Sequence, residues 1–196
     1  MAGRRDRRGD RREEILLAAL EVFAERGYTG ASIASIAERV GLTQQGVLHY
    51  FPSKDRLLAE VLMLRDQRNL DVIMLPGNEG AVTLDTVAAL VEYNAQRRGI
   101  VQSFTVLSAE SVIEDHPAKD FFQERYGSAR AWMAEVVRAE IGDELPGGVT
   151  PEQAAPLIFA VMDGLQLQWL LAPDEIDMPA LFRAFVSLLK AGVAAS

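Results

Sequence analysis

The chain has 196 residues, of which 49% are apolar and 24% charged, so its composition is that of a globular protein able to bury a core in one or two domains. It has no Cys, which excludes disulfides, thiolate metal sites and Cys nucleophiles. The net charge of −8 is unevenly divided, because residues 1–58 hold ten Arg and Lys against eight Asp and Glu, and residues 59–196 hold ten against twenty. Basic residues gathered near the N-terminus of an acidic chain indicate a polyanionic partner at that end.

Residues 1–9 are mostly Arg, Asp and Gly and offer almost nothing apolar to pack. We expect a disordered arm, whose arginines (Arg4, Arg5, Arg7 and Arg8) either reach phosphates and a minor groove or are simply solvated. No unbroken apolar region follows, so the arm does not resemble a signal peptide, and no segment offers the ~18 uninterrupted apolar residues of a membrane span. We therefore expect a cytoplasmic protein that does not enter a membrane.

A first helix is predicted over residues 10–26. Its apolar residues recur at helical spacing and form one buried stripe, and Gly27 provides a helix end. The stripe consists of Ile15, Leu16, Ala19, Leu20, Val22 and Phe23. We expect this helix to clamp the two helices that follow it.

Residues 32–51 predict two short helices joined by a tight turn. Ser32 is a good N-cap, and Ile33, Ile36, Ala37 and Val40 recur every three or four residues on one face. Gly41 suits the left-handed position that ends a helix, and Thr43 can cap a second helix over residues 44–50. This is the pattern of a helix-turn-helix motif, whose second helix reads DNA.

The second helix presents small or hydrogen-bonding, uncharged side chains. It has no acidic residue, and two glutamines stand in its first turn. Gln can pair with adenine in the major groove, and Thr can bond a base or contact a thymine methyl group. We expect the DNA-contacting residues of the chain to be Ser32, Thr43, Gln44, Gln45, Gly46, His49, Tyr50 and Lys54.

The run GYTGASIASIAERVGLTQQGVLHYFPSKDRLL, residues 27–58, resembles the DNA-binding domain of the TetR family of transcriptional regulators. The resemblance implies that Lys54, which opens the next helix, meets a backbone phosphate. The chain departs from the family at Leu48, where the family usually has a Tyr that commonly contacts phosphate. We therefore expect that phosphate contact to pass to His49 or Tyr50. The resemblance is specific over residues 10–58 and only architectural beyond them.

The rest of the chain reads as helices separated by Gly and Pro. We expect an all-α protein of about nine helices, with a DNA-binding domain over residues 10–53 and a ligand-binding and dimerisation domain over residues 54–196. The clearest break is the run PGNEG at 76–80, and a second loop is LPGG at 145–148. The later helices are predicted over 54–75, 84–98, 100–114, 117–141, 151–171 and 177–194.

The last two helices are the predicted dimer interface. Residues 157–171 are apolar on nearly all sides, which the surface of a monomer would not tolerate, although burial inside one subunit is the alternative. Reading a palindromic operator also requires two recognition helices about 34–36 Å apart. The residues assigned to this homodimer interface are Leu157, Val161, Gly164, Leu165, Phe182, Phe185 and Leu189.

Polar and aromatic residues on apolar helix faces are the candidates for a ligand site, because aliphatic residues normally fill these positions. Each also has a structural explanation, since aromatics at helical spacing are mostly core and a buried Asn or Ser can satisfy a backbone group. Asp163 and Gln166 could face either a pocket or the dimer seam. The candidates are Asn94, Phe104, Ser108, Ser111, Tyr126, Gln166 and Trp169.

Three function classes follow from these patterns. The favoured one, which the resemblance to the TetR family implies, is a homodimeric repressor that binds double-stranded DNA and is released by an unknown small-molecule effector. A helical interaction module without specific DNA binding is an alternative. A helical enzyme is disfavoured, because the chain has two His, no Cys, no Gly-rich phosphate loop, no HExxH motif and no Ser elbow. We expect no metal or cofactor.

Overall fold

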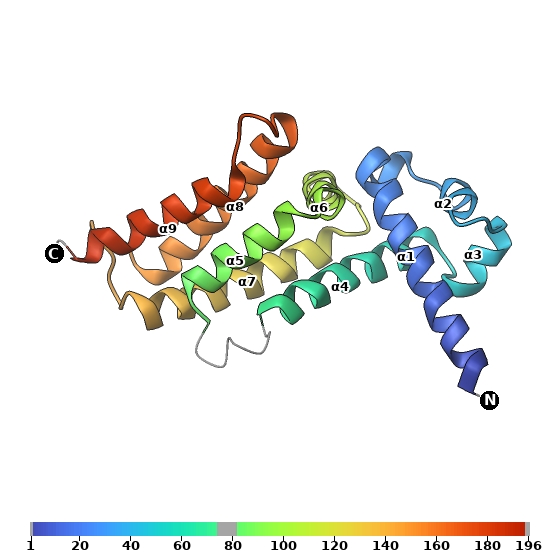
Figure 1. Ribbon diagram of the computed structural model, residues 1–196, viewed down its shortest axis with the longest axis horizontal. Helices are drawn as coiled ribbons and strands as arrows, with labels where there is room; N and C mark the ends of the chain where they lie inside the picture. The colour runs from blue at the N-terminus through green and yellow to red at the C-terminus, as the bar shows by residue number, and fades with distance from the viewer. Residues whose placement is uncertain (1, 74–81, 195–196) are drawn as a thin grey trace. The chain divides into compact units, whose positions relative to one another are not determined.

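The computed structural model describes residues 2–73 and 82–194, with only the backbone described for residues 2–8 and 192–194. These residues form nine helices and no named strand (Figure 1). The helices are α1 (Ala2–Gly30), α2 (Ile33–Arg39), α3 (Gln44–Tyr50), α4 (Lys54–Ile73), α5 (Leu84–Ala95), α6 (Arg98–Glu110), α7 (Lys119–Glu140), α8 (Pro151–Leu171) and α9 (Met178–Ala194). The prediction of an all-α fold with nine helices is confirmed. The predicted loop at 76–80 and the predicted helix end at 75 lie outside the described residues.

Helix α1 differs from the prediction at its N-terminal end, because it begins at Ala2 and replaces the expected disordered arm. Arg is a good helix former, and extending an existing helix avoids the cost of nucleation. The side chains of Arg4, Arg5, Arg7 and Arg8 lie outside the described part of the chain. At the other end, Gly27 interrupts the helix with φ 67° and ψ −179°, and one more turn leads to Gly30.

Helices α2 and α3 begin at the caps that the sequence indicates. Ser32 Oγ accepts the Ser35 N–H at 3.1 Å, and Ser35 Oγ accepts the Ser32 N–H at 3.2 Å, which makes a reciprocal capping box. Gly41 takes φ 63° in the turn, and Thr43 Oγ1 accepts the Gly46 N–H at 3.1 Å at the start of α3. These short helices therefore have their ends fixed by local hydrogen bonds.

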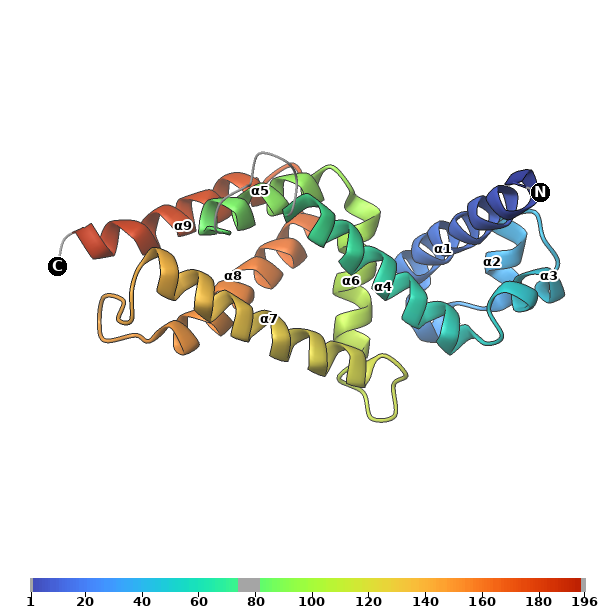
Figure 2. The same ribbon diagram turned by 90° about the horizontal axis from the view of Figure 1, so that it is seen from below.

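The chain divides into two compact units, each made of two separate stretches of the sequence. The first consists of Met1–Gln67 together with Gln102–Phe122, and the second of Arg68–Val101 together with Gln123–Ser196. Most of α6 and the beginning of α7 therefore belong with the helix-turn-helix, whereas the prediction ended that domain at residue 53. In the first unit α1 packs on α2, and α2 packs on α3 (Figures 1 and 2). The core of this unit includes the fully buried Phe23, Ile36, Val47, Phe51 and Leu57.

The second unit is built around α5, α8, α9 and the greater part of α7. Helix α9 runs along α5 and also packs on α8 (Figures 1 and 2). The core between them contains Leu84, Val91, Val137, Ile158 and Phe182. Lys190 of α9 donates to Asp85 of α5 at 2.7 Å and pairs with Glu140 of α7 at 2.6 Å, so ion pairs fasten the same helices at their edges.

Candidate nucleic-acid interface, effector site and dimer face

Helix α3 exposes a hydrogen-bonding face to solvent and packs its opposite face into the core of the first unit. Thr43, Gln44, Gln45 and His49 are exposed, whereas Val47 is fully buried. Gly46 and Tyr50 are half-buried, and the Tyr50 ring lies edge-on to His49 with centroids 5.7 Å apart. The exposed face can donate and accept hydrogen bonds without bringing negative charge to a phosphate backbone.

Ser32 and Thr43 act first as helix caps. The oxygen of each accepts an N–H three residues later, at 3.1 Å in both cases. Thr43 keeps its O–H as a donor, whereas Ser32 directs its own O–H to Ser35 Oγ at 3.2 Å. A cap of this kind fixes the direction in which its helix starts, so both residues position the helix-turn-helix whether or not they touch DNA.

Lys54 has a structural role that the sequence did not indicate. Its ammonium donates to the carbonyls of Tyr28 at 2.9 Å and Ala31 at 3.0 Å, and it lies 4.0 Å from the centroid of the Tyr28 ring. An ammonium has three N–H donors, so one is left over for a phosphate. The two carbonyls lie 26 and 23 residues earlier in the chain, which is why local sequence gives no sign of them.

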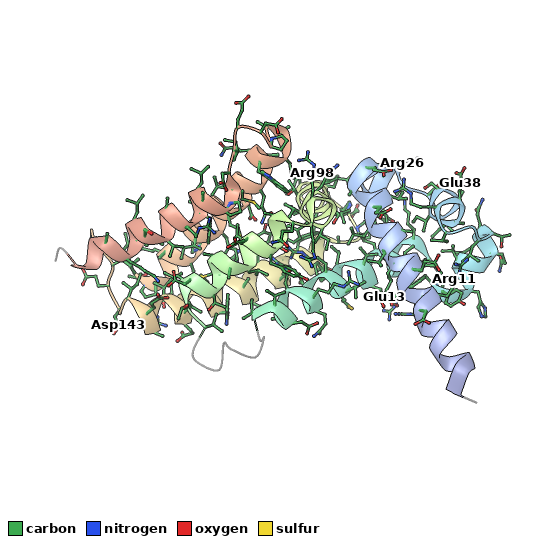
Figure 3. All side chains as sticks on the ribbon, viewed as in Figure 1. Arg11, Glu13, Arg26, Glu38, Arg98 and Asp143 are labelled. Carbon is green, nitrogen blue, oxygen red and sulfur yellow. The ribbon has the colours of Figure 1, made fainter. Side chains whose placement is uncertain are left out.

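Several arginines of the first unit are engaged within the protein. Arg39 pairs with Glu25 at 2.7 Å and with Glu21 at 3.2 Å, and the hydrogen bond from Arg39 lowers the pKa of Glu25. Arg11, labelled in Figure 3, donates to the Val40 carbonyl at 2.8 Å, where α2 ends. Arg39 and Arg11, which are part of the basic charge counted near the N-terminus, therefore link α1 to α2. The two ion pairs of Arg39 are exposed, so each contributes little to stability.

Four of the predicted ligand residues lie in the second unit. Gln166 and Asn94 are buried, with 4% and 5% of their surfaces exposed, and Asn94 Oδ1 has no hydrogen-bond partner among the described residues. Tyr126 donates its O–H to Asp163 at 2.7 Å and meets the Phe159 ring edge-on. Gln166 is therefore enclosed by its own unit, and the half-buried Asp163 is held by Tyr126 of α7.

Trp169 lies where α8 ends. Arg98, labelled in Figure 3, donates to the Leu170 carbonyl at 2.7 Å, and its guanidinium lies 5.5 Å from the Trp169 ring centroid.

The other three predicted ligand residues lie in the first unit, where each has a structural partner. Phe104 is buried against Phe122, with ring centroids 5.3 Å apart. Ser108 donates to the Thr105 carbonyl at 3.1 Å, and Ser111 donates to the Ser108 carbonyl at 2.7 Å. The contacts match the structural explanation, in which a Ser on a helix satisfies its own backbone.

The predicted dimer residues divide between core and surface. Phe182 is fully buried in the core of the second unit, so its assignment to the interface is wrong; α9 is apolar on two sides, and Phe182 is on the inner one. Val161, Leu165, Phe185 and Leu189 are partly buried against the same core. Leu157 is exposed, and nothing lies within 4 Å of a Cβ built on Gly164.

Exposed leucines lie on both helices of the predicted interface. Helix α8 exposes Leu167 and Leu171 as well as Leu157, and α9 exposes Leu181 and Leu188. Leu171 and Leu188 are 77% and 73% exposed, which is unusual for leucines on helices that pack against each other. Leu167 and Leu171 belong to the apolar run 157–171 on which the prediction of the interface rests, although only Leu157 of these leucines was assigned to it. We call these five residues the α8–α9 leucine face.

Helix α8 is long and apolar enough to cross a membrane by length and composition alone, although Asp163 and Gln166 interrupt its apolar residues, as the prediction expects. Its 18-residue window has a mean hydropathy of 1.4, and 22% of that window is buried. A helix of a water-soluble bundle with one side in the core and one side in an interface has the same properties. The burial of Gln166 and the contact of Asp163 with Tyr126 fit that explanation.

Two family models match the chain. The model for bacterial regulatory proteins of the tetR family matches residues 15–61, and the model for the C-terminal part of BetI-type transcriptional repressors matches residues 84–191. Together they cover the helix-turn-helix and the helices from α5 through most of α9.

Known proteins resemble the chain over most of its length. The regulator AcrR of Shigella flexneri is 24% identical over 190 residues, covering 91% of this chain and 86% of its own. A regulator from Saccharomonospora viridis solved with choline has a TM-score of 0.75 at 21% identity, covering 91% of this chain and 96% of its own. FadR of Bacillus subtilis solved with stearoyl-CoA has a TM-score of 0.67 at 20% identity, covering 92% and 98%.

These matches favour a regulator over an interaction module or a helical enzyme. The second family model alone spans residues 84–191, which is more than half of the 196 residues. The matched N-terminal region contains both caps, the turn at Gly41 and the exposed face of α3 described above. The chain therefore belongs to the TetR family of bacterial regulatory proteins and is a ligand-responsive DNA-binding transcriptional regulator.

Proposed function

We propose that the protein is a cytoplasmic homodimeric repressor that holds a palindromic operator and releases it when a small molecule binds the second unit. The observation that carries the proposal is the outer face of α3. It is rich in hydrogen-bonding groups, it has no charge that repels phosphate, and it is held by a capped N-terminus and a buried Val47.

Base reading is assigned to the exposed start of α3. Gln44 and Gln45 present side-chain amides, each of which can form two hydrogen bonds to an adenine. Thr43, beside them, offers a methyl and a hydroxyl group. Gly46 has no side chain, so the helix can approach the groove closely. His49 and Tyr50, in the last turn of α3, are assigned to the DNA backbone. Ser32 and the third N–H of Lys54 are assigned to phosphates.

The α8–α9 leucine face is proposed as the dimer interface. Two copies related by a two-fold axis would bury their leucines against each other, with Leu157, Val161 and Gly164 in the same stripe of α8. This arrangement would remove five exposed leucines per chain from water and would explain the high hydropathy of α8. It would also supply the second recognition helix that a palindrome requires.

The effector is proposed to bind among Asn94, Tyr126, Gln166 and Trp169. The unpartnered Asn94 Oδ1 is an acceptor that a ligand N–H or O–H would satisfy, and buried polar groups are rarely left without a partner. The ring of Tyr126 and the Asp163 carboxylate that it contacts suit a polar or cationic group. The related proteins solved with choline and with stearoyl-CoA support a small-molecule effector in this fold.

Release follows if the effector prefers a conformer whose two recognition helices are wrongly spaced. The effector shifts the equilibrium by as much as its affinities for the two conformers differ, and operator affinity falls by the same factor.

The test is fluorescence anisotropy with purified dimer and the DNA upstream of its own gene, at two salt concentrations and with scrambled DNA as competitor. The proposal expects saturable binding by two protomers, or a multiple of two, that survives the competitor. Binding that the competitor abolishes on every fragment of the flanking DNA would contradict it.

A further inference from the structure

Two side chains of α6 replace a backbone hydrogen bond that α1 loses at its break. In an unbroken helix the Tyr28 N–H would donate to the Ala24 carbonyl, four residues earlier, but Gly27 between them has φ 67°. Two side chains of α6 supply partners for these two groups. Glu110 accepts the Tyr28 N–H at 2.6 Å, and the Gln102 amide donates to the Ala24 carbonyl at 3.0 Å. We call these two hydrogen bonds the α1–α6 latch.

The absence of a side chain at Gly27 leaves room for the Glu110 carboxylate of the latch. It is buried, and a Cβ built on it would collide with the Glu110 carboxylate, so the carboxylate occupies the space that any other residue would fill. The positive φ also favours Gly at this position. The break in α1 and the carboxylate of α6 are thus fitted to each other.

The latch reaches the helices on both sides of the recognition helix. Tyr28 donates its O–H to Asp55 and accepts Lys54 at its carbonyl, and both partners stand in the first turn of α4, directly after α3. Lys54 also donates to the carbonyl of Ala31, the residue before the Ser32 cap of α2. Moving Tyr28 would therefore disturb the start of α2 and the start of α4 together.

The α6–α7 loop adds a further contact at Tyr28. The His116 ring meets the Tyr28 ring edge-on, with centroids 5.1 Å apart. Tyr28 accordingly has α4 on one side and the segment after α6 on another. The latch is the hydrogen-bonded part of this junction, and all of its residues belong to the first unit.

We propose that Glu110 and Gln102 are positioning residues for operator recognition, acting through Tyr28 although they lie far outside the helix-turn-helix sequence. Base reading tolerates displacements of only about 0.5 Å, so a junction that sets the starts of α2 and α4 sets operator affinity. The inference rests on the proposed operator binding. It adds that the DNA-binding unit is completed by residues 102–110, beyond the segment that the family model matches.

The experiment compares full-length variants in operator binding. Glu110→Ala removes the acceptor and should weaken operator affinity about tenfold, within the range of about 5–150-fold typical of coupled sites. Glu110→Gln keeps an oxygen for the Tyr28 N–H and should retain most of the affinity. Glu114→Ala is the control, because Glu114 is an exposed carboxylate four residues further on. A purely electrostatic effect would strengthen binding in all three variants.

A second measurement separates positioning from stability. Hydrogen exchange at the Tyr28 amide should accelerate in Glu110→Ala and stay slow in Glu114→Ala, at a temperature where every variant is folded. Gly27→Ala should weaken operator binding more than Glu110→Ala does, because it adds strain at a positive φ to the collision. Combining the two changes should restore part of that loss, since the collision is then gone.

Glu110→Ala with wild-type operator affinity would overturn the proposal, whatever its amide exchange. Unchanged Tyr28 exchange in Glu110→Ala would overturn it as well, because the latch would not exist in solution. A wild-type chain that binds no operator would instead refute the proposed function itself, so the two failures are distinguishable.

Discussion

Leu188→Asp tests the α8–α9 leucine face as the dimer interface. Leu188 is 73% exposed, so little of its surface is buried within the subunit, and the substitution should change the stability of a single chain by no more than about 0.5 kcal/mol. The variant should therefore fold with an unchanged helical circular dichroism spectrum. Its effect should fall on association.

The magnitude follows from the exposed area. Burying a whole Leu side chain contributes about 1.5–3 kcal/mol, so a Leu that is 73% exposed can contribute about 1–2 kcal/mol on each side of a two-fold axis. Losing both contributions costs about 2–4 kcal/mol, which raises the dimer dissociation constant roughly 30-fold to 1,000-fold. Two carboxylates facing each other would raise it further.

Sedimentation equilibrium over a range of protein concentrations measures that constant. Met63→Asp is the matched control, because Met63 of α4 is also an exposed apolar residue, at 55%, and lies in the other unit. We expect Leu188→Asp to be monomeric at concentrations where the wild type and Met63→Asp are dimeric. An unchanged dissociation constant in Leu188→Asp would refute the leucine face as the interface.

Three further predictions concern single residues. Phe182→Ala should cost about 3–5 kcal/mol and lower Tm by roughly 6–20 °C in a thermal melt, since Phe182 is core; a shift below 2 °C would contradict this. Burial lowers the pKa of His116, although the Glu110 carboxylate opposes this shift, so the wild type should lose stability as the pH falls below about 6.5. In thermal melts at pH 5.5 and 7.5, His116→Gln should lose less stability between the two pH values than the wild type does. Equal losses would refute this prediction. Lys54→Ala should weaken binding to every DNA sequence and reduce the salt slope by about one; an unchanged slope would restrict Lys54 to its two carbonyls.

The helices of the first unit could be predicted because their ends are fixed locally. Ser32, Gly41 and Thr43 each act within three or four residues of themselves, so their positions in the sequence are sufficient to place α2 and α3. The outward face of α3 follows from the same argument, since Val47 has to be the residue that turns inward.

The latch could not be predicted, because it depends on contacts between distant residues. Glu110 lies 82 residues from Tyr28, and Gln102 lies 78 residues from Ala24. Only the break at Gly27 is visible in the sequence, and it reads as an ordinary helix end. The assignment of residues 102–122 to the first unit was missed for the same reason.

The sequence predicts a dimer face on α8 and α9, but it could not tell which residues of α9 are free to form one. Helix α9 is apolar on two sides, and hydropathy alone does not tell which side faces the subunit's own core. The structure buries Phe182 and exposes Leu188, so packing against α5 and α8 decides the matter. In α8 the polar Gln166 is buried and Asp163 is held by Tyr126, so the polar residues of this helix do not mark its outer side.

Base reading by α3 is the central claim, and the most direct measurement compares Gln44→Ala and Gln45→Ala with the wild type on operator and on scrambled DNA. Each change should cost about 1–3 kcal/mol on the operator, with relaxed preference at one base pair per half-site and almost no change on scrambled DNA. Equal losses on both DNAs would contradict the account, because the glutamines would then be contacting the backbone.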